Sequence, residues 1–310
     1  MRERTVWSIG FGWGAAVFLV VGCGSGGSAL HPLANGNYQV ADQSLYFEVA
    51  TAGARVLDVH LPGGANLLTG PSTDAVSFGS TFWTSPQSLW LWPPPASFDS
   101  AAFAVSGTDA NLSFTGPVDG DFGMQITKRF AAGAGTATIG VEYRITSVVG
   151  DGMFAPWEIT RVGPGGLTFY PTGADAPRSG GGFALPPTQA AAGCTWYQHP
   201  GTAPGANQKL LADGSGGWLA HVAGGVVLVK KFADVPLGMA APSEAEIEIY
   251  VDGQGHYVEV EEQGAYQPLP AGQTLTWPVT WIVRPLPAGI DATAGSADLV
   301  AFVQSLVSPS

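Results

Sequence analysis

Charged residues are scarce in this chain of 310 residues: they make up 12% of it, against about 25% in an ordinary soluble domain. Basic residues are the scarcer kind, because 12 Lys and Arg stand against 24 Asp and Glu and give a formal net charge of -12. Such a chain repels phosphate backbones, which excludes nucleic acid as a partner. Hydrophobic residues still reach 45%, so the 44 glycines and 24 prolines indicate a folded chain rich in turns.

Cysteine is also rare, and the two residues are Cys23 and Cys194. Cys23 follows an N-terminal segment in which Arg2 and Arg4 precede an uncharged apolar run, the anatomy of an export signal. Together with the residues just before it, Cys23 forms the sequence Val20–Cys23, which resembles the bacterial lipobox. In a lipobox the cysteine is acylated and becomes the first residue of the mature protein. The pattern predicts lipidation at Cys23 and a bacterial cell-envelope location with a lipid anchor in the membrane.

This interpretation divides the N-terminus into a lipoprotein signal peptide, residues 1–22, and a flexible Gly/Ser-bearing tether, residues 23–36. An ordinary signal peptide and a short membrane anchor are the alternatives, although the apolar run is short for a membrane span. With lipid on Cys23, Cys194 has no partner. We therefore expect no intramolecular disulfide, even in an oxidising compartment.

Motifs for cofactors and metals are missing as well. The sequence contains no Walker loop, no H-E-x-x-H, no C-x-x-C and no EF-hand spacing, and it predicts no cofactor and no metal site. Asp119, Asp121 and Asp151 border glycines and are interpreted as turn formers, with a calcium site as the alternative.

Alternation of apolar and polar residues is the dominant pattern from about Asn37 to Pro287. In the segment 138–145, for example, every second residue is large and apolar, which is typical of a half-buried strand. Glycine-bearing turns separate such runs at hairpin spacing. The pattern predicts a single all-β domain over residues 37–287, with about fifteen antiparallel strands in two packed sheets.

One helix is expected, in a C-terminal tail over residues 288–310. Ser296 can cap a segment whose apolar residues recur at helical spacing and form one stripe. We expect this stripe to dock on the sandwich. Its residues are Leu299, Phe302, Val303 and Leu306.

Short motifs across the chain together resemble those of a known group of proteins. They are Gly53-Ala54-Arg55-Val56-Leu57, Asn66-Leu67-Leu68, Phe82-Trp83-Thr84-Ser85-Pro86-Gln87, Trp92-Pro93-Pro94-Pro95 and Trp157-Glu158-Ile159-Thr160-Arg161-Val162. They resemble an uncharacterised bacterial family of the galactose-mutarotase-like, or aldose 1-epimerase-like, superfamily. The segments Tyr257–Gln263 and Leu269–Gln273 are similar to the C-terminal glutamate strand and the following turn of mutarotases. The resemblance implies a β-supersandwich that binds sugars on a concave sheet.

The resemblance also implies where an epimerase would place its catalytic groups. Opening a sugar ring needs one group that removes a proton and another that delivers one. Glu261 is similar in position to the glutamate base of mutarotases. The strand that carries the histidine acid in mutarotases corresponds here to Pro156–Arg161, which has no histidine, and Arg161 cannot give up its proton. If the chain is an epimerase, His199 is the first choice for the acid.

Aromatic residues are the first candidates for sugar contacts, because flat rings stack on the apolar face of a pyranose. Trp83 and Trp92 lie in a proline-bearing segment that is not expected to be regular strand, and they form either a sugar platform or packing beneath a loop. Trp157, by contrast, lies in regular alternation and is interpreted as core.

Carboxylates provide the second group of candidates. Glu259 and Glu261 share a strand face with Tyr257, which is suited to accepting hydrogen bonds from sugar hydroxyls, although solvated strand glutamates are the alternative. Glu158 lies on the strand face opposite Trp157 and either belongs to a site or pairs with a cation such as Lys128 or Arg144. Glu246 and Glu248 are interpreted as an exposed edge. The predicted substrate-binding set is Trp83, Gln87, Trp92, Glu158, Arg161, Tyr257, Glu259 and Glu261.

Three functions follow from these observations. The missing histidine favours a monomeric lipoprotein that binds a saccharide without transforming it. The second is an aldose or hexose epimerase that uses Glu261 as its base, and the third is a scaffold lipoprotein. Fold resemblance alone does not choose among them.

Overall fold

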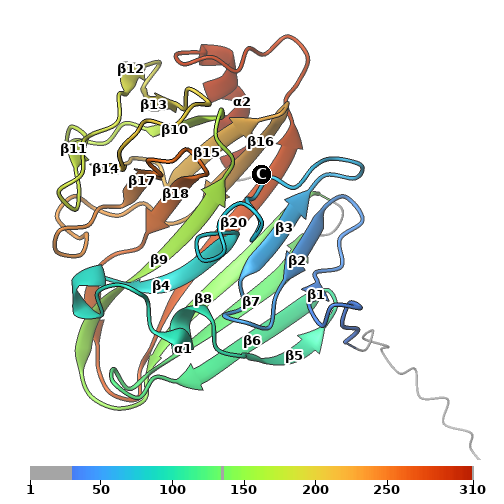
Figure 1. The fold of residues 1–310 in the computed structure, drawn as a ribbon, viewed down its shortest axis with the longest axis vertical. Helices are drawn as coiled ribbons and strands as arrows, with labels where there is room; N and C mark the ends of the chain where they lie inside the picture. Colours follow the sequence, from blue (N-terminus) through green and yellow to red (C-terminus); the bar gives the residue numbers. More distant parts are fainter. Residues whose placement is uncertain (1–29, 134–135, 309–310) are drawn as a thin grey trace, which may run out of the picture.

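The computed structural model describes residues 30–133 and 136–308. The predicted signal peptide, the lipidation site Cys23 and the first part of the tether lie outside the described residues. Two ten-stranded antiparallel sheets pack face to face and form a sandwich, shown in Figure 1. Among the described residues, none of the helices has both the length and the apolar character needed to cross a membrane.

The first sheet carries the features that matter for function, and its strands follow the order β1-β2-β3-β4-β9-β18-β17-β14-β11, with β19 paired to β9. These strands are β1 (Tyr38–Gln39), β2 (Tyr46–Val49), β3 (Val56–His60), β4 (Ser80–Ser85), β9 (Gly152–Val162), β11 (Arg178–Ser179), β14 (Gln208–Ala212), β17 (Ile247–Val251), β18 (Val258–Gln263) and β19 (Gln267–Leu269).

The second sheet has the order β12-β13-β10-β15-β16-β20-β8-β7-β6-β5. Its strands are β5 (Ala104–Thr108), β6 (Asn111–Val118), β7 (Met124–Gly133), β8 (Thr138–Ser147), β10 (Leu167–Pro171), β12 (Gln189–Ala191), β13 (Cys194–Gln198), β15 (Trp218–Ala223), β16 (Val226–Lys231) and β20 (Thr274–Pro285). Two short helical turns, η1 (Gln87–Leu89) and α1 (Ala96–Asp99), follow β4.

The predicted all-β sandwich is confirmed, but the described residues form twenty strands where about fifteen were expected. The difference comes mainly from strands of two or three residues, such as β1, β11, β12 and β19. Alternation over so few residues is not distinguishable from a turn. The core between the sheets is aromatic at its centre, where the Phe82 ring stacks on Tyr143 with centroids 4.1 Å apart.

The C-terminal helix is also confirmed, as α2 (Ala297–Val307). The side chain of Ser296 accepts a hydrogen bond from the backbone N–H of Leu299, so the predicted cap is the observed one. Leu299 and Val303 are buried in a second apolar cluster that includes Trp196 and Trp218. These tryptophans alternate with residues of the main core, so α2 covers the outer face of the second sheet.

A charged group lies between the two sheets, where Lys230 of β16 reaches across to Glu158 of β9. The Lys230 Nζ also contacts Glu262 at 3.3 Å and the hydroxyl of Thr160 at 2.8 Å, and all of these side chains are buried. Glu158 therefore pairs with Lys230, which corrects the suggested partners, Lys128 and Arg144. Lys230 belongs to the facing sheet, whereas the sequence suggested only cations on strands next to Glu158.

Candidate functional site

The outer face of the first sheet, which points away from the second sheet, brings charged and aromatic side chains together. Residues directly opposite one another on antiparallel strands project from the same face. The strand register aligns Lys209 of β14, Tyr250 of β17, Glu259 of β18 and Arg161 of β9 in one row. These strands are adjacent near the upper left of Figure 1.

The next two rows on this face continue the same alternation. Glu248 of β17 lies opposite Glu261 of β18, and Trp157 of β9 lies opposite Trp83 of β4. The outer face thus carries carboxylates toward β17 and β18 and tryptophans toward β4 and β9. A cation from β14, Lys209, completes the group.

A cavity of about 420 Å³ lies over this face, a size suited to a small organic ligand. Five of the eight predicted binding residues line it: Trp83, Gln87, Trp92, Tyr257 and Glu259. Two others, Arg161 and Glu261, lie in the layer of side chains that supports the lining residues. Sequence motifs far apart in the chain therefore converge on one cavity.

Aromatic rings form two walls of this cavity. On one side, Trp83 makes edge contacts with Trp157 and Trp92, with ring centroids 5.6 and 6.1 Å apart. On the other side, Tyr250 packs against Phe183 at 5.8 Å. Trp92 is 56% exposed, so part of its ring is free for a ligand.

Lys209 organises the charges at the base of the cavity. Its Nζ is 2.5 Å from Glu248 Oε2, 3.6 Å from Glu261 Oε2 and 5.1 Å from the ring centre of Trp157. Burial disfavours the ammonium charge, but the carboxylates of Glu248 and Glu261 outweigh burial and raise the pKa of Lys209 above its usual value. The lysine is therefore a permanent cation in the cavity wall.

Glu261 is completely buried beneath this lysine. The indole N–H of Trp157 donates to its Oε2 at 2.8 Å, and within the described part of the chain its Oε1 has no hydrogen-bond partner. Burial raises the pKa of Glu261 well above its usual value, against the opposing effect of Lys209, and the neighbouring Glu248 raises it further. Glu261 contacts Trp157 and Lys209 and is absent from the cavity lining, so it does not reach a ligand in the cavity directly.

Glu259 faces the cavity and is paired with a buried guanidinium. Arg161 Nε donates to Glu259 Oε1 at 2.8 Å, and an Arg161 Nη1 donates to the hydroxyl of Thr81 at 3.1 Å. The guanidinium is 1% exposed and also lies over the Trp83 ring, so it is fixed in place. Arg161 thereby positions the carboxylate of Glu259 as an acceptor for ligand hydroxyls.

Glu244, from the loop before β17, adds a further carboxyl to the cavity wall. Its Oε1 accepts the backbone N–H of Gln87 at 3.0 Å. Burial raises the pKa of Glu244, and the neighbouring Glu248 raises it further. In the neutral range this side chain is a hydrogen-bond donor as well as an acceptor.

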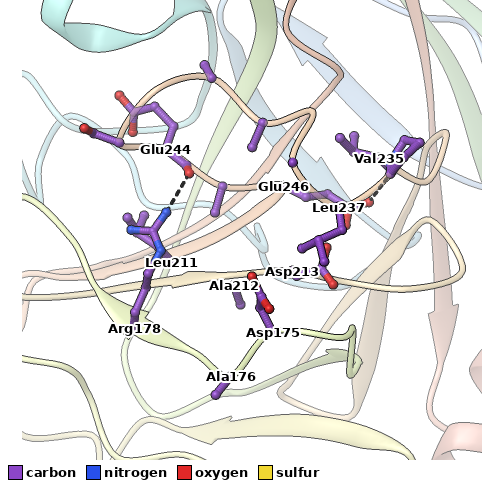
Figure 2. A pocket seen from close by; sticks show the side chains of 16 residues that line it. Asp175, Ala176, Arg178, Leu211, Ala212, Asp213, Val235, Leu237, Glu244 and Glu246 are labelled. Carbon is purple, nitrogen blue, oxygen red and sulfur yellow. Dashed lines mark hydrogen bonds between the residues drawn. The ribbon is translucent and has the colours of Figure 1, made fainter.

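A smaller cavity of about 230 Å³ adjoins the first (Figure 2). The loop that carries Val235, Leu237 and Glu244 forms one side, and Asp175 and Arg178 lie on the other. Glu244 lines both cavities, and Arg178 donates to its backbone carbonyl at 2.9 Å.

Several predicted positions are corrected by the structure. Glu158 faces the second sheet and not the cavity, because it lies on the other side of β9 from Trp157. Glu246 and Glu248 are 3% and 0% exposed, so they are not an exposed edge. Trp83 lies in regular strand, because β4 ends at Ser85, before the first proline of that segment.

His199, the proposed acid, is held at the end of β13 in the second sheet. Its Nδ1 accepts the backbone N–H groups of Gly165 at 3.0 Å and Gly201 at 2.9 Å, and its ring is buried. Burial lowers its pKa. The ring orders a turn and does not line the cavity on the first sheet.

Sequence analysis missed Lys209, Phe183, Tyr250 and Glu244, and it assigned Trp157 to the core only. Lys209 lies beside the apolar pair Leu210 and Leu211, and a lysine in such a run is a weak sign of a buried cation. Phe183 and Glu244 come from loops whose placement depends on the tertiary fold. Nothing in the local pattern indicates either.

Of the aspartates considered for calcium, Asp119 forms a turn, as the interpretation of the sequence proposed, whereas Asp151 bonds a distant loop. Asp119 Oδ1 accepts the backbone N–H groups of Asp121 and Phe122 at 2.9 and 2.8 Å. Asp151 Oδ1 accepts the N–H of Ala271 at 2.8 Å. In the described ranges, no group of three or more His, Cys, Asp and Glu side chains could hold a metal ion.

Solved structures with a similar fold all share one architecture. A galactose mutarotase-like protein from Lactobacillus casei is 12% identical, with a TM-score of 0.55 over 80% of this chain and 100% of its own. A galactose mutarotase related enzyme from Lactobacillus acidophilus is 9% identical, with a TM-score of 0.55 over 84% and 99%. The fold is galactose mutarotase-like.

An aldose epimerase homologue from C. elegans agrees with this, at 11% identity and a TM-score of 0.54 over 81% of this chain and 99% of its own. No family model matches the chain, and no curated protein matches it either. The galactose mutarotase-like sandwich is therefore established by the structure, whereas the narrower resemblance to an uncharacterised bacterial family stays a prediction.

Proposed function

We propose that this protein binds carbohydrate in the cavity on the outer face of the first sheet and does not transform it. The observation that carries the proposal is the composition of the cavity, in which tryptophan and tyrosine rings stand beside the fixed carboxylate of Glu259 and the ammonium of Lys209. Rings contact the apolar faces of a sugar, and the charged groups bond its hydroxyls. The galactose mutarotase-like fold supports a carbohydrate-related role.

A calorimetric titration with common hexoses and their oligomers tests the proposal. Replacing the exposed Trp92 by alanine is expected to lower affinity about three- to tenfold, because one stacking surface is lost. Leu91→Ala is the control, since Leu91 is 67% exposed and adjacent in sequence but does not line the cavity. Absence of affinity for every sugar tested would instead favour the scaffold function.

Epimerase activity is the second candidate, with Glu261 as base. The positions of both groups argue against it, because Glu261 is buried and does not line the cavity, and His199 is held at a turn of the second sheet. Glu261→Gln separates the two candidates, because the amide keeps the shape and one acceptor of the carboxyl. Because Glu261 is buried and does not line the cavity, a binding site is expected to keep its affinity within about threefold, less than the worth of one hydrogen bond. Rapid anomeric exchange by saturation-transfer NMR, abolished in this variant, would establish the epimerase instead.

We propose further that the protein is exported and anchored in the bacterial cell envelope through lipid on Cys23, as a monomer. The lipobox-like residues before Cys23 support this. Cys23→Ser is expected to move the protein from the membrane fraction to the soluble fraction at precursor size. An intact mass of the wild-type protein without an acyl group would contradict the anchor, and light scattering measures the oligomeric state.

A further inference from the structure

The second cavity, about 230 Å³, is continuous with the first in its walls. Leu211, Ser243 and Glu244 line both. Leu211 lies near the end of β14, and the other two belong to the loop before β17. The two cavities therefore lie side by side, with these shared residues between them.

The second cavity offers hydrogen-bonding groups of both kinds. Arg178 lines it as a donor, and only one of its N–H groups is directed to the backbone carbonyl of Glu244. Glu246 lines it as an acceptor and is itself 3% exposed. Its two oxygens accept the N–H groups of Val235 and Gly214 at 3.0 and 2.9 Å, which fixes the carboxyl in place.

Apolar and acidic side chains both line this hollow (Figure 2). Val235 and Leu237 project from one side, and Asp175 stands on the other. Leu237 is 58% exposed, which leaves apolar surface for the face of a ring. Aromatic residues are absent among those that line it, so a ring here would be held mainly through its hydroxyls.

We propose that the two cavities are adjacent subsites for one oligosaccharide of at least two sugar units, with the linkage between units lying beside Glu244. The proposal rests on the carbohydrate-binding function proposed above. The first unit stacks on the tryptophans of the first cavity, and the second unit bonds Arg178 and Glu246 in the second.

The charges of both subsites narrow the class of saccharide. In the second subsite, Arg178 stands among Asp175, Asp213 and Glu246. In the first, Lys209 pairs with Glu248 and Arg161 pairs with Glu259, so neither sign is in excess there. Acidic groups outnumber the single basic group in the second subsite, so a uronic acid is repelled from it. The ligand is a neutral oligosaccharide.

Titration calorimetry on the full-length chain tests this directly. The probes are glucose, galactose and mannose, each beside its 1,4-linked trimer, and α-1,4-trigalacturonic acid beside α-1,4-galactotriose. For the sugar that binds, the trimer is expected to bind about tenfold more tightly than the monomer, which corresponds to one or two added hydrogen bonds. The uronic acid trimer is expected to bind more weakly than its neutral counterpart.

Ala176→Trp isolates the second subsite. Ala176 is exposed and lines only the second cavity, so a tryptophan there fills that space without entering the first. The variant is expected to lose the advantage of the trimer and keep the affinity for the monomer within about twofold, a difference below one hydrogen bond. Ala301→Trp, at an exposed position of α2, is the matched control.

The outcomes distinguish the two proposals. The second subsite is overturned if monomer and trimer bind with equal affinity, or if Ala176→Trp lowers both affinities equally. Either result leaves the proposed sugar binding intact. Tighter binding of the uronic acid trimer overturns the assignment to neutral saccharides. If neither monomer nor trimer of any probe binds, the carbohydrate function fails together with its subsites.

Discussion

Buried ionisable side chains show how strongly single residues depend on their surroundings in this fold. His221 of β15 is 5% exposed, and its Nδ1 lies 2.9 Å from the hydroxyl of Thr168. Burial, with a smaller effect of the nearby His199, lowers the pKa of His221 from 6.5 to about 4. The ring is therefore neutral in the native protein across most of the acidic range.

This histidine predicts a loss of stability in acid. As the pH falls from 6.5 to 4, the unfolded chain binds a proton at this ring that the native state cannot bind, so the free energy of unfolding decreases. The contribution amounts to about 3 kcal/mol. In His221→Gln, urea unfolding between pH 7 and pH 4 should show a shallower decline than in the wild type.

His31→Gln provides the comparison for that experiment, because the side chain of His31 is 69% exposed. It is expected to change the pH dependence far less. If the two variants decline in parallel with the wild type, His221 is not the group responsible.

The sequence indicated some of the residues that line the cavity and missed others. Trp92, Gln87 and Tyr257 were predicted as binding residues from their motifs, and they do line the cavity. Lys209 was missed, because a lysine in an alternating strand is usually solvated. Only the meeting of β14 with β17 places it against Glu248.

At the scale of elements, the terminal helix is the segment whose local signals were complete. The cap residue and the apolar stripe were both identified in 296–306, and α2 forms there. Ser296→Ala is expected to destabilise the protein by about 1 kcal/mol, because the N–H of Leu299 loses its acceptor. Thermal unfolding followed by circular dichroism measures this.

Ser305→Ala serves as the control in the same helix, because its hydroxyl is exposed and bonds only the carbonyl of Phe302. Equal losses in both variants would mean that the cap has no special role.

Strands were predictable where one face meets solvent and the other meets the core. The segment 138–147 alternates strictly in burial and was identified as a strand from the same alternation in sequence. β17 misled the interpretation, because Glu246 and Glu248 suggest a solvent face. The cavity and the loop 233–245 lie over that face instead. The sequence of β17 alone does not indicate that this face is covered.

At the scale of the whole molecule, the buried charged side chains between the two sheets contribute to holding the sandwich together. Lys230 of the second sheet bonds Glu158 and Glu262 of the first, and its Nζ lies 3.6 Å from the centre of the Trp281 ring. Burial raises the pKa of Glu262 well above its usual value, against the effect of Lys230, and Glu158 raises it further. Lys230 thus lies between two buried carboxyl groups, and Glu158 is the closer of the two.

Removing the lysine leaves Glu158 buried without a counter-charge between the sheets. We expect Lys230→Met to lower the free energy of unfolding by about 3–5 kcal/mol at pH 7, measured by urea denaturation. Lys128→Met is the matched control, because Lys128 is equally buried in the second sheet but donates to the backbone carbonyls of Gly53 and Ala54. Burial lowers its pKa to about 7, so its replacement should cost only about 1–2 kcal/mol.

A triple variant decides whether the group stabilises the sandwich or only avoids an unpaired charge. With Lys230, Glu158 and Glu262 all replaced by methionine, no charge remains to be compensated, and apolar side chains of similar length fill the space between β9, β16 and β18. Most of the stability lost in Lys230→Met is then expected to return. If the triple variant has a lower free energy of unfolding than Lys230→Met, the ion pair itself holds the two sheets together. In that case, removing the uncompensated charge of Glu158 would have restored no stability.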